Sequence, residues 1–262
     1  YSSFLHFNMN KEQLIEKISS KKEFSDLPRK DVGLAFEKFD KPEYTDEEKV
    51  DYTRDLLRKV FSAFVSQKIL SLKDKDEEWV LRKHISTKER LENYEELYSK
   101  LLEEYENVSV VDFGAGVNGF SYKFFPSDVE VSYLAIESMG QLVDLINYYF
   151  EKQGIEGKAV KESLFDLENV KKEIGKYSFH KVGFLFKTVD SLEMLKWNYS
   201  KEFLKEIVPL FEKVVISFAT RSLISKKKFV VDRSWIVNYL EEQFEVLEDF
   251  ELGNERYLVI SG

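Results

Sequence analysis

The sequence predicts an α/β protein, in which a mostly parallel sheet alternates with helices and follows a helical N-terminal part. Three observations support this fold class. Residues 1–83 carry helical periodicity, with apolar side chains recurring every three to four positions. Short apolar runs then recur along the rest of the chain, with helical stretches between most of them. A glycine-rich turn follows the first of these runs, where a strand leads into a helix at the ligand-binding edge of such sheets.

Two helices are expected in the N-terminal part. Lys11–Ser20 is a short charged segment, and Asp46–Leu70 is a longer amphipathic one. Pro28 and Pro42 mark loops between them. The apolar positions of the longer segment are Val50, Leu57, Val60, Phe61, Phe64, Val65 and Ile69. We therefore expect a helical domain over residues 1–83 and an α/β domain over residues 84–262.

The second domain is expected to open with a helix. Ser86 is followed by Glu89 three residues later, which is the pattern of a capping box, so a helix should begin near Thr87. Seven strand-like runs follow it. They are Val108–Phe113, Val129–Ile136, Lys158–Phe165, Val182–Phe186, Val214–Phe218, Phe244–Phe250 and Tyr257–Ile260. The last two lie close in sequence and can pair antiparallel.

Composition excludes several classes of protein. No apolar run reaches the roughly 20 residues that span a bilayer, and the N-terminal residues lack a secretory-signal pattern, so we expect a cytoplasmic protein without a membrane segment. The chain has no cysteine, and its three histidines lack ligand spacing, so we expect no metal site. Residues 1–83 carry 17 basic and 17 acidic side chains, which places the net charge of −9 on the second domain.

The turn at Val110–Phe120 indicates a cofactor site. Gly114, Gly116 and Gly119 form the pattern G-x-G-x-x-G, which lets a ligand approach the backbone closely. Asp112 precedes the turn, and its carboxylate would repel the pyrophosphate of a dinucleotide. S-Adenosylmethionine instead carries an ammonium group and a sulfonium, which a carboxylate attracts. We therefore favour S-adenosylmethionine as the cofactor over NAD.

Two more acidic residues follow later strand-like runs. Glu137 lies 18 residues after Gly119, an interval typical of a carboxylate that accepts the ribose hydroxyls. Asp166 directly follows the third run, where it can accept a hydrogen bond from the adenine amino group. The alternative is that these acidic residues only cap helices.

Five segments in register resemble the aminoglycoside-resistance 16S ribosomal RNA methyltransferases. They are HISTKERL (84–91), VDFGAGVNGF (111–120), FLFKTVDSLE (184–193), VVISFATRSL (214–223) and NERYLVISG (254–262). The resemblance implies a Rossmann-like S-adenosylmethionine-dependent methyltransferase domain with a small helical N-terminal domain that helps to bind RNA. It also implies methylation of guanine N7 in the decoding region of the small ribosomal subunit.

The family's cofactor contacts correspond to particular residues of this chain. The resemblance implies that Gly114, Ala115 and Gly116 hold the methionine part and that Glu137 holds the ribose. Arg90 would pair with the cofactor carboxylate, and Leu167 would lie beside Asp166 near the adenine. From the residues alone, Arg90 could equally lie on a solvated helix face.

The acceptor side is expected after the fourth strand-like run. Lys187 could donate to the cofactor or to O6 of the guanine, and Glu193 could fix the base, which makes both candidate catalytic residues. The alternative is an exposed lysine and glutamate with no role in the site. Beyond the fifth run, Arg221 and Lys226, Lys227 and Lys228 form a basic segment expected to contact RNA phosphates.

The sequence also departs from the family. Ala115 and Gly119 stand where the family has cysteine and proline, and Asp190 stands where it has proline. The segment FVVDRSW replaces the family's glycine-methionine-glutamate-glutamate. The alternatives of adenine N1, of transfer RNA, of a small-molecule acceptor and of a non-catalytic RNA-binding relative therefore stay open, as does a resistance role.

Overall fold

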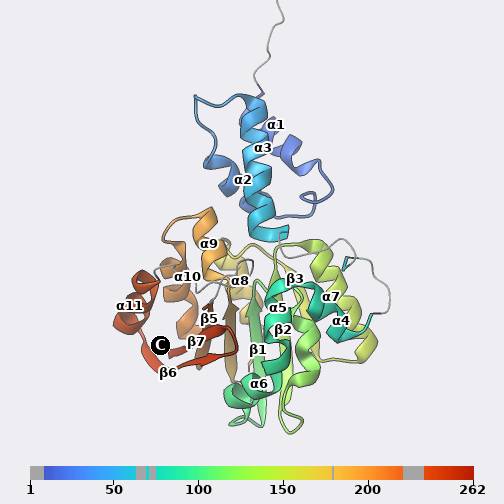
Figure 1. Ribbon diagram of the computed structural model, residues 1–262, viewed down its shortest axis with the longest axis vertical. Helices are drawn as coiled ribbons and strands as arrows, with labels where there is room; N and C mark the ends of the chain where they lie inside the picture. Colours follow the sequence, from blue (N-terminus) through green and yellow to red (C-terminus); the bar gives the residue numbers. More distant parts are fainter. Residues whose placement is uncertain (1–8, 63–68, 71–74, 179, 221–232) are drawn as a thin grey trace, which may run out of the picture.

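The computed structural model describes residues 9–62, 69–70, 75–178, 180–220 and 233–262. At its centre is a seven-stranded sheet in the order β3-β2-β1-β4-β5-β7-β6 (Figure 1). The strands are β1 (Asn107–Phe113), β2 (Glu130–Glu137), β3 (Gly157–Lys161), β4 (Lys181–Phe186), β5 (Lys213–Ala219), β6 (Glu245–Leu252) and β7 (Glu255–Ser261). The first five strands are parallel, and β7 runs antiparallel to β5 and β6. The predicted α/β fold class and the antiparallel pairing of the last two strands are confirmed.

Helices cover both faces of this sheet, because its central strands are apolar on both sides. On one face pack α4 (Glu77–Lys83), α6 (Tyr94–Leu102) and α7 (Gly140–Gln153). On the other face pack α8 (Leu167–Ile174), α9 (Val189–Leu195), α10 (Tyr199–Ile207) and α11 (Ser234–Gln243). Alternate residues of β1 supply the two cores: Val110 belongs to the first and Val111 to the second.

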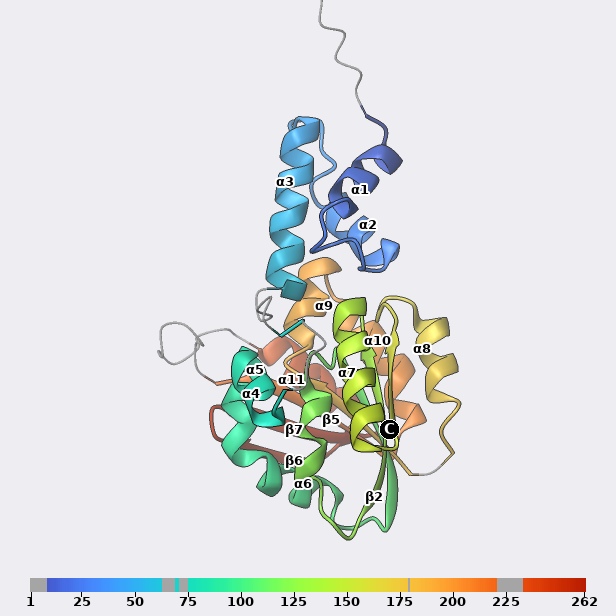
Figure 2. The ribbon, with the colours of Figure 1, turned by 90° about the vertical axis from the view of Figure 1, so that its right-hand side faces the viewer.

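Three helices form an N-terminal helical unit, the name used here for residues 9–62. They are α1 (Lys11–Ser19), α2 (Arg29–Glu37) and α3 (Asp46–Leu57), and the unit stands above the sheet in Figures 1 and 2. Asn10 and Thr45 open α1 and α3 with complete capping boxes. The buried side chains of the unit join the core on the α8–α11 face of the sheet. The helix predicted at Lys11–Ser20 is confirmed to within one residue.

The predicted helix Asp46–Leu70 differs from what the structure contains. The α-helical part ends at Leu57 and passes into a π-helical turn, η1 (Arg58–Ser62). Residues 63–68 and 71–74 lie outside the described part of the chain. The wider turn places Val60 and Phe61 beside the pocket between the helical unit and the sheet, and π turns occur frequently at functional sites.

The third strand is shorter than predicted, whereas the other six begin and end within two residues of the predicted bounds. The prediction extended it to Phe165, but β3 ends at Lys161. The chain turns there because the backbone N–H of Asp166 donates to the carbonyl of Ser163 at 2.9 Å, and that of Phe165 donates to the hydroxyl of Ser163 at 3.1 Å. Apolar residues inside the turn gave the sequence the pattern of a strand.

The predicted capping box at Ser86 and Glu89 is wrong. Helix α5 (Ile85–Arg90) begins one residue before Ser86, with His84 at the N-cap position. The hydroxyl of Thr87 donates to the carbonyls of Leu81 and His84 at 2.7 and 3.1 Å, which fixes the sharp turn from α4 into α5. Glu89 extends instead toward Lys187.

The packing of α10 against the sheet generates a stability prediction. Phe203 is fully buried, and its ring contacts those of Phe113 and Tyr199 at centroid distances of 5.4 and 6.2 Å. Replacing it by alanine leaves a cavity, so Phe203→Ala should lower the free energy of unfolding by about 3–5 kcal/mol in urea titrations. Leu247→Ala, on the exposed side of β6, is the control and should change it by less than about 0.5 kcal/mol. Equal effects of the two variants would contradict this packing.

Candidate active site

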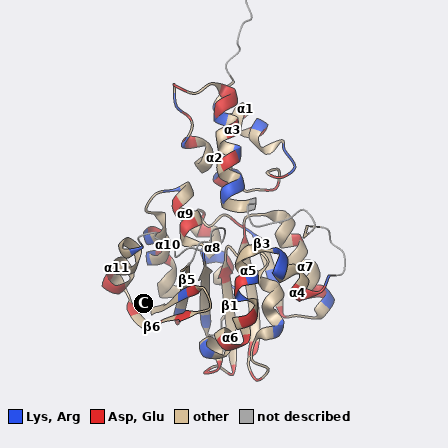
Figure 3. Cartoon of the chain, viewed as in Figure 1, with Lys and Arg blue, Asp and Glu red and all other residues tan. Residues whose placement is uncertain are grey.

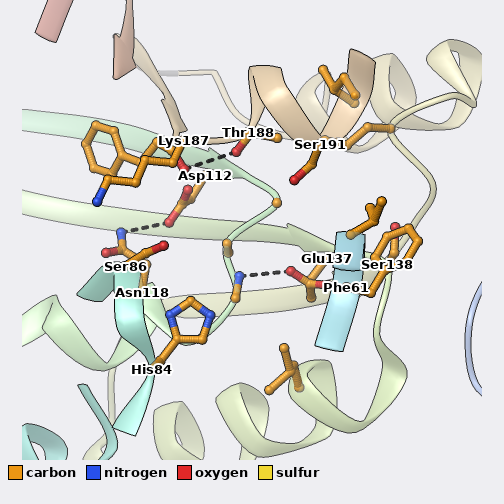
Figure 4. A pocket seen from close by; sticks show the side chains of 18 of the residues that line it. Phe61, His84, Ser86, Asp112, Asn118, Glu137, Ser138, Lys187, Thr188 and Ser191 are labelled. Atoms are coloured by element: carbon orange, nitrogen blue, oxygen red, sulfur yellow. Dashed lines mark hydrogen bonds between the residues drawn. The ribbon is translucent and has the colours of Figure 1, made fainter. Parts of the chain in front are cut away.

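A pocket lies at the carboxyl ends of β1, β2 and β4, the edge at which parallel sheets bind ligands (Figure 4). Residues from the glycine turn and the ends of these strands line one side of it. The N-terminal helical unit contributes Asp31, Val60 and Phe61. Helix α5 and the turn before it contribute His84, Ser86, Thr87 and Arg90. The pocket is therefore assembled from segments that are far apart in sequence.

The packing around the glycine turn requires glycine at two of its positions, whether or not a ligand is bound. Gly114 and Gly116 have φ values of 67° and 55°, in the left-handed region that favours glycine. A Cβ atom on Gly114 would lie 3.0 Å from Cγ2 of Thr188, and one on Gly116 would lie 3.2 Å from Nε2 of His84. The backbone N–H of Gly114 donates to the carbonyl of Ile136 at 2.8 Å, which joins the turn to β2.

Asp112 lies beneath this turn and lines the pocket. It is 2% exposed and accepts hydrogen bonds from Asn118 Nδ2 at 2.8 Å and from the hydroxyl of Tyr133. Burial raises the pKa of its carboxyl group, although the two hydrogen bonds oppose that shift. Asp112 is thus a buried acidic group that a nearby cation would stabilise in its charged form.

Glu137 ends β2 and is also buried in the pocket wall. One of its oxygens accepts a hydrogen bond from the backbone N–H of Gly116 at 2.8 Å (Figure 4). The other accepts one from the backbone N–H of Met139 at 2.9 Å. Burial raises the pKa of this carboxyl group too, and the backbone donors oppose the shift. Glu137 therefore holds the glycine turn against the end of β2 and presents a carboxylate at the same place.

Arg90 lies in a buried polar network, so the alternative that it lies on a solvated helix face is wrong. Its Nε donates to both oxygens of Glu255 at 3.0 and 3.2 Å, and its Nη1 donates to Asn118 Oδ1 at 3.0 Å. The guanidinium lies over the ring of Phe186, 4.7 Å from its centroid. Arg90 lines the pocket, as expected for a residue that contacts the cofactor, but Glu255 is its ionic partner in the protein.

Lys187 lies on the opposite side of Glu255. Its Nζ is 2.6 Å from Glu89 Oε2 and 3.3 Å from Glu255 Oε2, and its side chain is 10% exposed. Its backbone has φ 56°, a strained conformation for a lysine and one that is often found at functional sites. The backbone N–H of Lys187 donates to the hydroxyl of Ser217 at 3.1 Å, which fixes the turn. Lys187 lines the pocket and is not an isolated surface residue.

Glu255 is a site residue that the sequence did not indicate. It is 2% exposed, at the start of β7, and its pKa reflects two opposed effects. Burial alone would raise that pKa, but the charges of Arg90 and Lys187 and the hydrogen bond from Ser217 hold it below its usual value. In the sequence, the only indication of its role was that an acidic residue stands at the start of an apolar strand.

Asp166 and Leu167 do not line the pocket, although the resemblance placed both near the adenine. Asp166 is the N-cap of α8 and accepts a hydrogen bond from the backbone of Asn169 at 3.4 Å, and Leu167 is the first residue of that helix. Among the described residues that line the pocket, their neighbours Leu164 and Phe165 appear, but Asp166 and Leu167 do not.

Glu193 is also placed away from the pocket wall. Its carboxylate accepts hydrogen bonds from the backbone N–H groups of Asn198 and Ser200, the second at 2.8 Å. It therefore fixes the turn from α9 into α10. Of the described residues of α9, Val189 to Leu195, it is Ser191, Leu192 and Leu195 that line the pocket. The acceptor-side role predicted for Glu193 stays a prediction.

The remaining expectations concern RNA, metal and membrane. Arg221 and Lys226–Lys228 lie outside the described residues. Within the described ranges, no cluster of three or more His, Asp or Glu side chains could hold a metal ion. No helix in that part of the chain has the length and apolar character needed to span a membrane.

Comparison with known proteins identifies a family. Residues 47–249 match the family model described as Ribosomal RNA methyltransferase (FmrO). No curated protein matches the sequence.

Several solved structures share the fold. An rRNA methylase from Escherichia coli aligns with a TM-score of 0.75 and 19% identity, covering 96% of this chain and 99% of that one. The 16S rRNA methyltransferase RmtF, in complex with S-adenosyl-L-homocysteine, aligns with a TM-score of 0.75 and 18% identity, covering 97% and 99%. The 16S rRNA methylase RmtB aligns with a TM-score of 0.74 and 18% identity, covering 97% and 98%. At such identities the likeness establishes the fold, over nearly the whole of each chain.

The buried ion pairs of Glu255 generate a prediction about stability and pH. Glu255→Gln removes the anion and leaves Arg90 and Lys187 buried without it, which should lower the free energy of unfolding by about 3–5 kcal/mol at pH 7. The folded-state pKa of Glu255 lies below its unfolded value, so its stabilisation is fully present above the unfolded pKa. It is lost as the pH falls through the folded pKa.

Urea denaturation at a series of pH values measures the difference in free energy of unfolding between the wild type and Glu255→Gln. The gap between wild type and Glu255→Gln should narrow as the pH falls below 4.5, the ordinary pKa of glutamate. Asp249→Asn is the control, because Asp249 forms an exposed pair with Arg256 and should contribute about 0–1 kcal/mol. A gap that stays constant with pH would contradict the proposed charge of Glu255.

Proposed function

Because the chain belongs to the Ribosomal RNA methyltransferase (FmrO) family, we propose that it transfers a methyl group from S-adenosylmethionine to guanine N7 of small-subunit ribosomal RNA. As a member of that family, the protein is a ribosomal RNA methyltransferase. One observation supports the cofactor: three buried carboxyl groups, those of Asp31, Asp112 and Glu137, surround the pocket at the carboxyl edge of the sheet.

The chemistry of these carboxyl groups fits S-adenosylmethionine. Burial raises the pKa of Asp112, which lies beneath the glycine turn, so a positively charged ligand there would stabilise its ionised form. The cofactor carries a sulfonium and an ammonium group, whereas the pyrophosphate of NAD would meet like charge. The methionine part would lie against Gly114, Ala115 and Gly116 near Asp112, and Glu137 would accept the ribose hydroxyls. When bound, S-adenosylmethionine supplies an electrophilic methyl group.

The protein's own task in this reaction is mainly positioning. Guanine N7 has a free lone pair, so no residue has to remove a proton before it attacks the methyl group. Correct placement of two reactants contributes at most roughly 7–11 kcal/mol to a rate enhancement. Lys187 lines the pocket, and we propose that its ammonium group donates to O6 of the guanine. Glu193 would have to leave the α9–α10 turn to reach the base.

RNA binding is proposed for the helical part and for the basic segment. In Figure 3, acidic and basic residues alternate along the N-terminal helical unit. We propose the predicted helical RNA-binding domain over residues 1–83 and the methyltransferase domain over residues 84–262, although α4, at the end of the first, packs against the sheet. Arg221 and Lys226–Lys228, which follow β5 in the sequence, would supply positive charge for contacts with RNA phosphates. The target guanine would have to be unstacked, at a cost of a few kcal/mol.

The acceptor atom can be tested directly. Small ribosomal subunits, free ribosomal RNA and transfer RNA are each incubated with the protein and labelled S-adenosylmethionine. Methylation at N7 makes the glycosidic bond labile, so borohydride and aniline should cut the RNA at one guanine in the decoding region. Label without cleavage would exclude N7 and favour adenine N1. Cleavage in transfer RNA would support methylation at guanine N7 but exclude small-subunit ribosomal RNA as the target. Label in a small molecule would exclude both guanine N7 and the ribosomal RNA target.

A pair of variants separates the two candidate catalytic residues. Lys187→Met should reduce turnover by about 10²-fold, as is typical when one donor to a reacting base is lost, with a much smaller change in affinity for S-adenosylhomocysteine. Turnover is measured on small subunits, affinity by calorimetry and folding by the unfolding midpoint.

Glu193→Gln is compared in the same assays. Lost turnover with an unchanged unfolding midpoint would support its predicted role at the base. A lowered midpoint with turnover retained would assign it to the α9–α10 turn alone. Wild-type turnover of Lys187→Met would exclude Lys187 from the acceptor side.

A further inference from the structure

We propose that Asp31, on the N-terminal helical unit, is a cofactor-positioning residue that couples binding of the adenosine half of S-adenosylmethionine to docking of that unit. The inference rests on the proposed cofactor and extends it to a residue outside the methyltransferase domain. It is supported by the placement of Asp31, by the groups that surround it, and by a second aspartate of the same unit that makes a comparable contact away from the pocket.

Asp31 joins three parts of the chain. It lies in the first turn of α2, is 1% exposed, and lines the pocket. Its Oδ2 accepts a hydrogen bond from the hydroxyl of Ser138 at 2.8 Å, and its Oδ1 accepts one from the hydroxyl of Ser163. Ser138 directly follows β2, and Ser163 lies in the turn after β3. One carboxylate from the helical unit therefore holds together the ends of two neighbouring strands.

The position of these strand ends indicates which half of the cofactor is concerned. Figure 4 shows Glu137, Ser138 and Phe61 at one end of the pocket, and Asp112, Asn118 and Lys187 at the other. The glycine turn and Asp112 form the proposed methionine end. The opposite end, with Glu137 for the ribose, is thus the adenosine end.

Asp31 provides a polar group at that end. Leu164 and Phe165 line the pocket there and give it an apolar surface suited to a purine ring. The exocyclic amino group of adenine is a hydrogen-bond donor, and Asp31 brings an acceptor to this surface. A purine that bears an oxygen at that position would present an acceptor to the same carboxylate.

A buried carboxylate is costly unless it is well paired, so its presence calls for a reason. Burial raises the pKa of Asp31, and the bonds from Ser163 and Ser138 only oppose that shift. If this position served only for packing, an apolar side chain would stabilise the fold more than the buried carboxylate of Asp31 does. Perturbed carboxyl groups that line a pocket are candidates for ligand binding.

Asp26 supplies the comparison. It belongs to the same unit and contacts Lys161 Nζ at 3.1 Å, close to the N-terminus of α7. A Cβ atom on Gly140 would lie 2.0 Å from Asp26 Oδ2, so this approach requires the glycine. Asp26 thus docks the unit on the same domain but is not among the described pocket-lining residues. The two docking carboxylates therefore differ in access to the pocket, and Asp26 is also the more exposed of the two, with 41% of its side chain accessible to solvent.

The coupling between cofactor binding and docking of the N-terminal helical unit must be reciprocal. If the cofactor gains affinity from Asp31 in its docked position, bound cofactor must favour the docked unit by the same factor. A protein loaded with methyl donor would then hold the helical unit firmly against the sheet. The unit would be released more easily when the cofactor is absent.

The experiment compares Asp31→Asn with Asp26→Asn in the full chain. Calorimetry measures binding of S-adenosylhomocysteine and of S-inosylhomocysteine, in which an oxygen replaces the adenine amino group. Asp31→Asn should weaken binding of S-adenosylhomocysteine by about tenfold and reduce the preference for it over the inosine analogue, because an amide can donate to that oxygen. Asp26→Asn should leave both affinities within about twofold. A purely structural role of Asp31 would not change the preference between the two ligands.

Proteolysis measures the coupling. S-Adenosylhomocysteine should slow tryptic cleavage at Lys21 and Lys22 in the wild type and in Asp26→Asn, and much less in Asp31→Asn. Ser163→Ala removes one donor to Asp31 without altering a lining residue, so it should weaken binding several-fold even if Asp31→Asn fails to fold.

The outcomes are distinguishable. Wild-type affinity and ligand preference in Asp31→Asn, or in Ser163→Ala if the first variant does not fold, would overturn the role of Asp31 and leave the cofactor assignment intact. A wild-type protein that binds neither ligand would overturn the cofactor assignment and this inference with it.

Discussion

The carboxylate of Glu255 is the anion on which the arrangement of the ligand-binding edge depends. Arg90 reaches it from α5 and Lys187 from the turn after β4, so one buried acidic group fixes two cations from different segments. Arg90 in turn donates to Asn118, which donates to Asp112 beneath the glycine turn. A continuous series of polar contacts thus runs from β7 to β1. In such a buried network the loss of one member leaves charges unpaired, which is far more destabilising than the loss of a surface pair.

The parts of the site that could be predicted from the sequence are local in the chain. Gly114 and Gly116 follow a strand directly, and their left-handed backbones are what this turn requires. Asp112 and Glu137 were found because each stands at the end of an apolar run, and parallel strands bring such ends to one edge. The order of the strands was predictable for the same reason, since it depends on periodicity within short windows, whereas helices α2 and α4 were not predicted.

The rest of the site depends on contacts between distant positions. Arg90 and Glu255 are 165 residues apart, and Asp31 and Ser163 are 132 apart, so no local pattern indicates either contact. Glu193 and Asp166 show a different limit of prediction from sequence, because their local positions do not reveal which groups their side chains contact. Glu193 follows β4 as predicted, whereas Asp166 lies beyond the end of β3 rather than directly at it, and the oxygens of both accept hydrogen bonds from nearby backbone N–H groups. Sequence spacing placed these residues at the correct edge and could not decide between a helix cap and a ligand contact.

The pocket also relates the two parts of the molecule. Its wall combines strand ends of the sheet with Asp31, Val60 and Phe61 of the N-terminal helical unit. The unit shares its core with the α8–α11 face of the sheet, so it is packed against the site rather than appended to it. Residues that recognise an acceptor could therefore influence the methyl-donor site through direct contact.

The place of β7 in the sheet has a consequence for the order in which the protein becomes complete. β7 is the last of the described strands to be synthesised, yet it lies between β5 and β6 and carries Glu255. Translation at about 5–20 residues per second needs roughly 8–33 s to pass from Arg90 to Glu255. Arg90 is made at the start of that interval and Lys187 part-way through it, so both cations are synthesised before their shared anion. The nascent chain can thus form its early strands and its glycine turn, but the ligand-binding edge is finished only when the β6–β7 hairpin leaves the ribosome.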